Sequence, residues 1–232
     1  MKSFFCKTWL LPLALGAGLI VSPTLRAQPA ANADLVPLIL KLPEPSFVGT
    51  PKDVQPGSNV EPISKTPRPD LLVPKGVKNL APGSKITCSD PNATPVALAK
   101  LTDGAKEALD DNVTLLRKGV QWVQFDLGAK QEIYAIVIWH AHDTLKVYRG
   151  VVVQIADDPE FTTNVRTLFN NDADNGDKLG AGTDKEYFET NQGKLIDAKG
   201  AKARCVRLYS HGSSESGLNE YTEVEIHGRG AQ

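Results

Sequence analysis

The chain has 232 residues, of which 41% are hydrophobic, 23% charged and only 6% aromatic, and its formal net charge at pH 7 is -1. A nearly neutral chain offers no broad basic surface, so the composition gives no support for nucleic acid or an anionic membrane as the partner.

The first 27 residues have the pattern of a secretory signal peptide. Lys2 and Lys7 precede an apolar run over residues 9–21, and residues 25–27 fit a cleavage site. The run is shorter than the roughly 20 residues that span a bilayer, so we predict cleavage and export, not a membrane anchor. The expected location is the periplasm, the cell envelope or the medium. Cleavage removes three basic residues and no acidic one, which changes the net charge from -1 to -4.

Residues 28–75 are rich in proline and contain ten of the sixteen prolines of the chain. Proline fixes φ and lacks a backbone donor, so this segment is predicted to be an extended arm instead of a helix or a central strand. An apolar cluster at residues 35–42 distinguishes the arm from a free linker. The arm is therefore expected to dock on the following domain or on a partner.

Residues 76–229 have the length of one domain, and strand patterns dominate them. Apolar and polar residues alternate with period two in some segments, and others are almost wholly apolar and β-branched. The predicted strands are 121–127, 133–141, 150–156, 203–210 and 221–227. Helix is expected only at 95–101, with a turn at 105–110. This pattern, with turn residues between the strands, predicts an all-β, antiparallel β-sandwich.

Two cysteines, Cys88 and Cys205, follow the signal segment. In an exported protein such a pair predicts one disulfide, which would here link the start of the domain to a late strand. Two free thiols are the alternative.

Several short strings follow one another in a fixed order between residues 77 and 228. The most informative are Leu101-Thr-Asp-Gly104, Trp122-Val-Gln-Phe-Asp-Leu-Gly128 and Thr222-Glu-Val-Glu-Ile-His-Gly228, and the others are 79–81, 133–139, 148–157 and 203–208. In this order they resemble the discoidin, or coagulation-factor C-type, domain family. The resemblance implies a galactose-binding-like jelly roll that serves as a non-catalytic binding module. Members bind glycans, lipid head groups or proteins, so the fold alone does not fix the ligand.

The same resemblance implies calcium as a stabilising cofactor. Many relatives hold one ion between the Asp-Gly turn and the glutamate of the last strand, and these positions match Asp103 and Glu223. Backbone carbonyls near Lys100 and Lys106 would complete the oxygen shell that calcium prefers. The alternative is that Asp103 makes a turn hydrogen bond and Glu223 faces solvent.

A weaker metal candidate lies in the acidic string at residues 170–177, which includes Asp172 and Asp174. Its alternating side-chain oxygens resemble a calcium loop, but the glycine and glutamate positions of an EF-hand are missing. A solvated loop is the alternative interpretation.

His140 and His142 are two residues apart on a predicted strand and would share a face. They suggest a ligand-binding rim at the strand end. Two other interpretations stay open: a zinc site with His211 or Asp143 as third ligand, and a strand cap in which both imidazoles bond backbone carbonyls.

The polar, glycine-rich loop at residues 210–220 carries His211 and Asn219. Loops on a rigid sandwich commonly carry binding residues, so we expect this loop to form one rim with the histidine pair, Tyr148 and Arg149.

The sequence thus predicts a secreted, calcium-stabilised, non-catalytic module that binds glycan. It contains no nucleophile elbow, zinc-protease motif or phosphate-binding glycine loop. Adjacent residues point apart, so Asp110 and Asp111 indicate a solvated turn and not a glycosidase pair. One alternative is a structural or adhesion scaffold that binds a cell-surface or envelope protein through arm and sandwich. A metal-dependent hydrolase that uses His140 and His142, or its accessory domain, is the other alternative.

Overall fold

The computed structural model describes residues 1, 34–46, 59–64 and 66–231. The chain divides into two units, Met1–Ala33 and Asp34–Gln232, and every element below belongs to the second. Apart from Met1, the predicted signal segment lies outside the described residues. In the part that is described, no helix has the length and apolar character needed to cross a bilayer.

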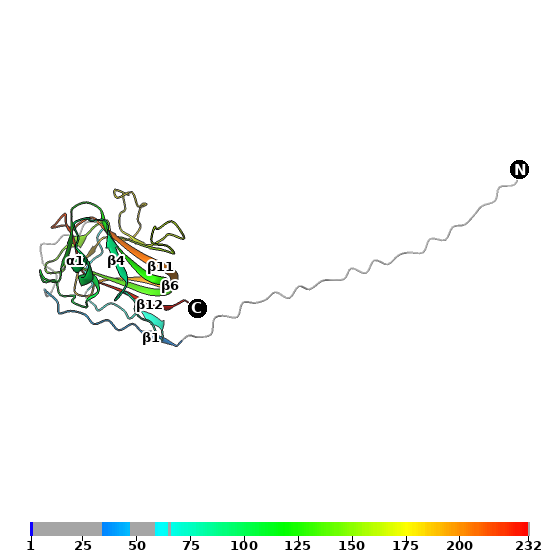
Figure 1. Cartoon of the computed structure of the whole chain (residues 1–232), viewed down its shortest axis with the longest axis horizontal. Helices are drawn as coiled ribbons and strands as arrows, with labels where there is room; N and C mark the ends of the chain where they lie inside the picture. The colour runs from blue at the N-terminus through cyan, green and yellow to red at the C-terminus, as the bar shows by residue number, and fades with distance from the viewer. Residues whose placement is uncertain (2–33, 47–58, 65, 232) are drawn as a thin grey trace. The chain divides into compact units, whose positions relative to one another are not determined.

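Strands dominate the described residues, which otherwise hold one short α-helix and one turn of 3-10 helix (Figure 1). The elements are β1 (Leu35–Pro37), β2 (Leu72–Pro74), β3 (Lys78–Asn79), β4 (Lys85–Cys88), α1 (Pro95–Ala99), η1 (Lys100–Thr102), β5 (Thr114–Leu116), β6 (Gln121–His140), β7 (Val147–Tyr148), β8 (Val152–Ala156), β9 (Arg166–Asn170), β10 (Tyr187–Phe188), β11 (Lys194–Ser210) and β12 (Asn219–Gly230).

The main sheet is antiparallel, and β6 lies at its centre. Its strand order is β3-β12-β6-β11-β8-β9, with β4 paired to β6 and β5 paired to β12. β6 and β11 pair from Gln121↔Ser210 to Ile138↔Lys194, with register shifts between Asp197 and Ala201 and between Ala203 and Cys205. Such irregularities bend long strands, so that they run through both layers of a sandwich. The fold is the antiparallel jelly-roll β-sandwich that the resemblance implied.

β6 joins two segments that the sequence predicts as separate strands. Gly128 lies between them with φ of +78°, a conformation that glycine adopts at little cost. Its N–H donates to Oδ1 of Asp126 at 2.9 Å. The glycine therefore turns the strand without ending it.

The predicted helix is confirmed at its start and is shorter than expected. The side chain of Thr94 accepts a hydrogen bond from the N–H of Ala97, and Pro95 occupies the first turn, as at many helix N-termini. The α-helix ends at Ala99, and 3-10 geometry continues to Thr102, which brings Asp103 to the end of the turn.

The core lies between the layers and brings aromatic and branched side chains together. Trp139, Tyr148, Tyr221 and Phe125 are the bulkiest of the fully buried side chains. Trp139, Tyr148 and Tyr221 lie near the ends of β6, β7 and β12.

The described parts of the arm are extended and contact the sandwich. β1 pairs with β2 in antiparallel register. Lys106 Nζ donates to the carbonyl of Lys41 at 2.8 Å, and Asn191 Nδ2 donates to the carbonyl of Pro43 at 2.9 Å. Of the two expected ways in which the arm could dock, the structure thus shows docking on the domain that follows it.

The predicted disulfide between Cys88 and Cys205 is wrong, because both are free thiols. Cys88 on β4 pairs with Val123 of β6, whereas Cys205 on β11 pairs with Asp126 of β6. β6 therefore lies between the two cysteines. Two strand spacings place the Cα atoms about 9–10 Å apart before any offset along the strands, beyond the ~7 Å limit for a disulfide.

Candidate functional site

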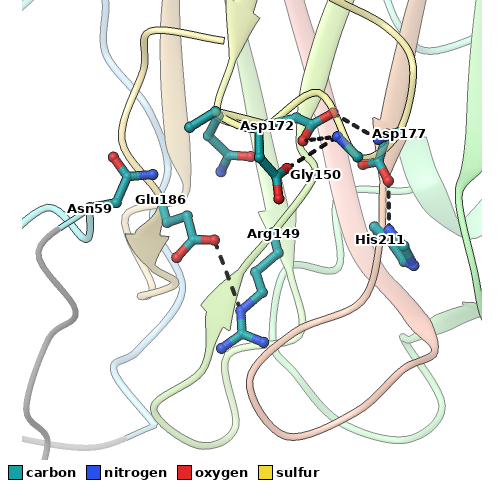
Figure 2. Close-up of a pocket in the computed structure, with 11 residues that line it drawn as sticks. Asn59, Arg149, Gly150, Asp172, Asp177, Glu186 and His211 are labelled. Carbon is teal, nitrogen blue, oxygen red and sulfur yellow. Dashed lines mark hydrogen bonds and ion pairs between the residues drawn. The ribbon is translucent and has the colours of Figure 1, made fainter. Parts of the chain in front are cut away.

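A polar cavity of about 550 Å³ is the candidate site (Figure 2). Among the described residues, five segments that are distant in the sequence line it. They contribute Asn59 from the arm, Arg149 and Gly150 after β7, residues 171–174, 176 and 177 after β9, Glu186 before β10, and His211 after β11. No Phe, Tyr or Trp is among the described residues that line it.

Backbone pairing positions Arg149 and His211 beside each other. The N–H of His211 donates to the carbonyl of Arg149 at 3.0 Å, and the N–H of Arg149 donates to the carbonyl of Gly212 at 3.3 Å. The side chains of Arg149 and His211 are about half exposed. Two of the predicted rim residues therefore lie at the cavity, on a fixed backbone.

Gly150 makes room for the residues that close one side of the cavity. Its φ is +56°, and a Cβ there would lie 2.1 Å from Oδ2 of Asp177 and 2.7 Å from Cβ of His211. Both the backbone conformation and the space require glycine at this position.

A buried asparagine side chain holds the Arg149–Gly150 segment from below. Oδ1 of Asn171 accepts the N–H of Val151 at 2.7 Å, and its Nδ2 donates to the carbonyl of Tyr148 at 3.2 Å. Asn171 is only 2% exposed. These bonds fix the backbone on both sides of Arg149.

The acidic loop is closed by its own hydrogen bonds. The two carboxylate oxygens of Asp172 accept the N–H groups of Gly176 and Asp177, at 3.0 and 2.9 Å, and Oδ1 of Asp174 accepts from Gly176 at 3.1 Å. These bonds engage the carboxylate oxygens within the loop, in which Asp172 is 7% exposed and Asp174 is exposed to solvent. The metal interpretation of Asp172 and Asp174 stays a prediction. Across the described residues, no group of three or more His, Cys, Asp or Glu side chains is placed to hold a metal.

Asp177 and His211 join the acidic loop to the loop after β11. Nδ1 of His211 lies 2.6 Å from Oδ1 of Asp177, whose side chain is 4% exposed. Burial raises the pKa of the Asp177 carboxyl, and the hydrogen bond from His211 opposes this effect. On the other side of the cavity, Nε of Arg149 lies 3.9 Å from Oε1 of Glu186 (Figure 2).

His140 and His142, expected at the rim, are fully buried instead. Nδ1 of His140 lies 2.9 Å from Oε2 of Glu189, and its ring stacks on Tyr148 at 4.2 Å. Nε2 of His142 lies 2.9 Å from the carbonyl of Lys106. β6 ends at His140, so the two side chains do not share a strand face. The two rings have different hydrogen-bond partners, and among the described residues no third side chain joins them in a group that could hold zinc.

Tyr148 and Asn219 are also structural residues and not rim residues, since both are fully buried. The hydroxyl of Tyr148 donates to the carbonyl of Ala141 at 3.0 Å. Oδ1 of Asn219 accepts from Ser210 and Gly212, and its Nδ2 donates to two backbone carbonyls. The sequence could not separate these polar residues from surface ones, because both kinds lie near strand ends.

Asp103 and Glu223, the residues expected to bind calcium, lie close to each other. Glu223 is 1% exposed, and its Oε2 accepts the N–H of Gly104 at 3.1 Å. Oδ1 of Asp103 accepts the N–H of Ala105 at 2.8 Å. Burial raises the pKa of Glu223 to about 8, and the nearby carboxylates of Asp103 and Glu225 add to the shift.

This buried carboxyl group beside a second one fits a hard cation, because a cation would favour the ionised form that burial and the neighbouring carboxylates disfavour. The two carboxylates alone make an incomplete shell, so carbonyl groups would have to add to it. The carbonyl of Lys100 accepts a long 3.5 Å bond from the N–H of Asp103. The carbonyl of Lys106, also expected as a ligand, already bonds His142.

Sequence reasoning missed Asn59 and Glu186, and it gave Asp177 and Asn171 no role beyond the acidic string. The string was the available signal for the last two. No local signal distinguishes Asn59 or Glu186, because their place at the cavity comes from pairing between the arm and the strand region.

No protein-family model matches the sequence, and no curated protein matches it either. Among solved structures, the chain is similar to a family 89 glycoside hydrolase from Clostridium perfringens, with 16% identity and a TM-score of 0.48. That match covers 66% of this chain and 15% of the hydrolase.

Two similar solved structures are small modules. A fucose-binding module from Streptococcus pneumoniae has 18% identity and a TM-score of 0.46, over 64% of this chain and 96% of the module. Chitosan-binding module 1 of a chitosanase/glucanase from Paenibacillus sp. IK-5 has 18% identity and a TM-score of 0.44. That match covers 64% of this chain and 98% of the module. At these identities the likeness concerns the fold alone.

Proposed function

We propose that this protein is a non-catalytic module that binds carbohydrate in the polar cavity. The lining of the cavity carries the proposal: a guanidinium, an imidazole, amides and carboxylates from five segments face one space of about 550 Å³. Sugar hydroxyls both donate and accept hydrogen bonds, and these side chains supply both roles. A cavity with several convergent polar groups is the usual form of a small-ligand site.

Recognition would depend on hydrogen bonds, since the described lining holds no Phe, Tyr or Trp for a sugar ring to stack on. Arg149 is the main donor, because its guanidinium offers several N–H groups in one plane and stays charged. Glu186 is the main acceptor beside Arg149, since its side chain is 23% exposed, whereas Asp177 is 4% exposed and already bonds His211.

The charge of the cavity favours neutral or amino sugars over acidic ones. Among the described residues that line it, four are carboxylates, Asp172, Asp174, Asp177 and Glu186, against the guanidinium of Arg149 and the imidazole of His211. A uronic or sialic acid would add a like charge at short range, which is unfavourable where water is partly excluded. An ammonium group would be attracted to the same carboxylates.

The test is a glycan array with neutral, amino and acidic sugars, followed by calorimetric titration of the glycan that binds. Arg149→Ala should weaken binding about 10- to 100-fold, the effect of losing hydrogen bonds from a charged group. Arg117→Ala is the matched control: Arg117 is 54% exposed and 3.9 Å from Asp90, as Arg149 is 56% exposed and 3.9 Å from Glu186. A glycan array without any binding by the folded protein would reject the proposal. An equal loss of glycan affinity in Arg149→Ala and Arg117→Ala would reject it as well.

We also propose export and a calcium ion at Asp103 and Glu223 as parts of this function. Support for export comes from the sequence of residues 1–27, which lie outside the described residues apart from Met1. Support for calcium comes from the buried Glu223 carboxylate beside Asp103. The ion would stabilise the folded domain and take no part in chemistry.

A second candidate function, a scaffold that binds an envelope or cell-surface protein, is favoured by one observation. Several large apolar side chains of the arm are exposed, among them Leu35 (55%), Ile39 (80%) and Leu72 (55%). Exposed apolar groups of this kind often mark protein contacts. Pull-down with and without substitutions of these residues to serine would test this function.

A further inference from the structure

The arm contributes one side of the candidate cavity through a short backbone bridge. Val60 pairs in parallel with Glu186. The N–H of Glu61 donates to the carbonyl of Glu186 at 2.8 Å, and the N–H of Glu186 donates to the carbonyl of Asn59 at 3.1 Å. Residues 59–61 thus hold Glu186 from the side opposite Arg149; we call these three residues the arm wall.

The arm wall is anchored to the sandwich beyond the bridge itself. Val60 is 9% exposed. Oε2 of Glu61 lies 3.0 Å from Nζ of Lys194, and Nη1 of Arg68 donates to the carbonyl of Gly193 at 2.9 Å. The contacts of Glu61 and Arg68 therefore place the arm wall relative to the start of β11.

The remaining sides of the cavity do not depend on the arm. Arg149 and His211 are held by their mutual backbone bonds, and Asp177 is held by Asp172 and His211. Glu186 differs, because both of its backbone bonds in the bridge go to the arm. Asn59 lies on the far side of Glu186 from Arg149 and lines the same cavity (Figure 2).

We propose that the arm wall is part of the carbohydrate site, so that the sandwich without it has an incomplete cavity. Asn59 donates and accepts hydrogen bonds to the sugar through its carboxamide. The backbone bridge acts as a positioning element that sets the Glu186 carboxylate against Arg149. This inference rests on the proposed function and assigns to the arm a role that the sequence did not predict.

The experiment compares two variants at one position. Glu61→Pro removes the N–H that bonds the carbonyl of Glu186, whereas Glu61→Ala keeps that N–H and loses only the ion pair with Lys194. Amide hydrogen exchange of Glu186 reports the bridge without any ligand. Calorimetric titration with the glycan selected on the array reports the site.

Glu61→Pro should speed exchange at Glu186 and weaken glycan binding about 5- to 20-fold, the effect of losing roughly one or two hydrogen bonds. Glu61→Ala should leave binding within about two-fold, because exposed ion pairs contribute little. Asn59→Ala, which leaves the bridge intact, should weaken binding about 5-fold with no change in exchange at Glu186. This last variant also tests the inference should Glu61→Pro fail to fold.

The inference is overturned by unchanged binding in both Asn59→Ala and a folded Glu61→Pro. Unchanged exchange at Glu186 in Glu61→Pro would refute the bridge. If Arg149→Ala still weakens binding in either case, the proposed function stands while the role of the arm falls. If the wild-type protein binds no glycan, both fall together, whatever the exchange rates show.

Discussion

The imidazole of His211 lies 2.6 Å from the carboxylate of Asp177, and this contact connects two loops of the sandwich. One loop follows β11, and the other is the acidic loop that follows β9. Asp172 accepts the N–H groups of Gly176 and Asp177 within the acidic loop, and the Asp177 side chain meets His211 of the other loop. This contact links the acidic loop to the backbone that carries Arg149, because the N–H of His211 donates to the carbonyl of Arg149.

Gly150→Ala should collapse this part of the cavity. The new Cβ would lie 2.1 Å from Oδ2 of Asp177, at a residue whose φ is +56°. We expect a loss of about 1–3 kcal/mol in the free energy of unfolding from strain and overpacking, measured by urea unfolding. We also expect glycan affinity to fall at least about ten-fold.

Gly119→Ala is the control for the backbone strain alone. Its φ is +85°, and nothing lies within 4 Å of a Cβ built there. It should lower stability by about 1 kcal/mol and leave affinity unchanged. Equal affinities in the two variants would show that the contact of Asp177 with His211 has no part in binding.

Asn219→Ala should lower stability and spare binding. The buried amide makes four hydrogen bonds, to Ser210, Gly212, Arg117 and Gly119. Removing it leaves several buried polar groups without partners, so the free energy of unfolding should fall by about 2–4 kcal/mol. Titration of the folded variant should give wild-type affinity. A loss of affinity without a loss of stability would restore Asn219 as a ligand residue.

Glu223 should make the metal-free protein less stable as pH rises. The folded-state pKa is about 8, against 4.5 for the free side chain. Between these values the folded state binds a proton that the unfolded state has released, so stability falls across this window. Urea unfolding in EDTA at pH 5 and pH 8 should show the fall in the wild-type protein and a smaller one in Glu223→Gln. The same fall in unfolding free energy in the wild-type protein and in Glu223→Gln would contradict the assignment of this pH dependence to Glu223.

Calcium should reverse that loss by binding only the folded state. At a free concentration of about 100 times Kd, it would add about 2.7 kcal/mol to the free energy of unfolding. We expect thermal unfolding of the wild-type protein to shift to higher temperature with calcium relative to EDTA. Asp103→Asn and Glu223→Gln should abolish the shift, whereas Asp174→Asn, in the acidic loop, should retain it. No shift in the wild-type protein would remove calcium from the proposal.

The candidate site was only partly predictable. Arg149 and His211 are predicted as rim residues and the acidic string at 170–177 as a weaker metal candidate, and the structure brings both rim residues and most of the string to one cavity. His140, His142 and Asn219 carried the same signal but lie inside the protein. A polar residue near a strand end is buried or exposed according to which other segment of the chain packs against it, and that segment is distant in sequence.

The sequence by itself determined what depends on neighbouring residues. Period-two alternation at 121–127 and 221–227 specifies strands because one side chain in two must be buried, and proline excludes helix from the arm. Tertiary structure alone decided which strands flank β6, and hence that Cys88 and Cys205 remain apart. It also decided that Asn59 meets Glu186, because a backbone bridge between distant segments leaves no mark on the side-chain pattern of either one.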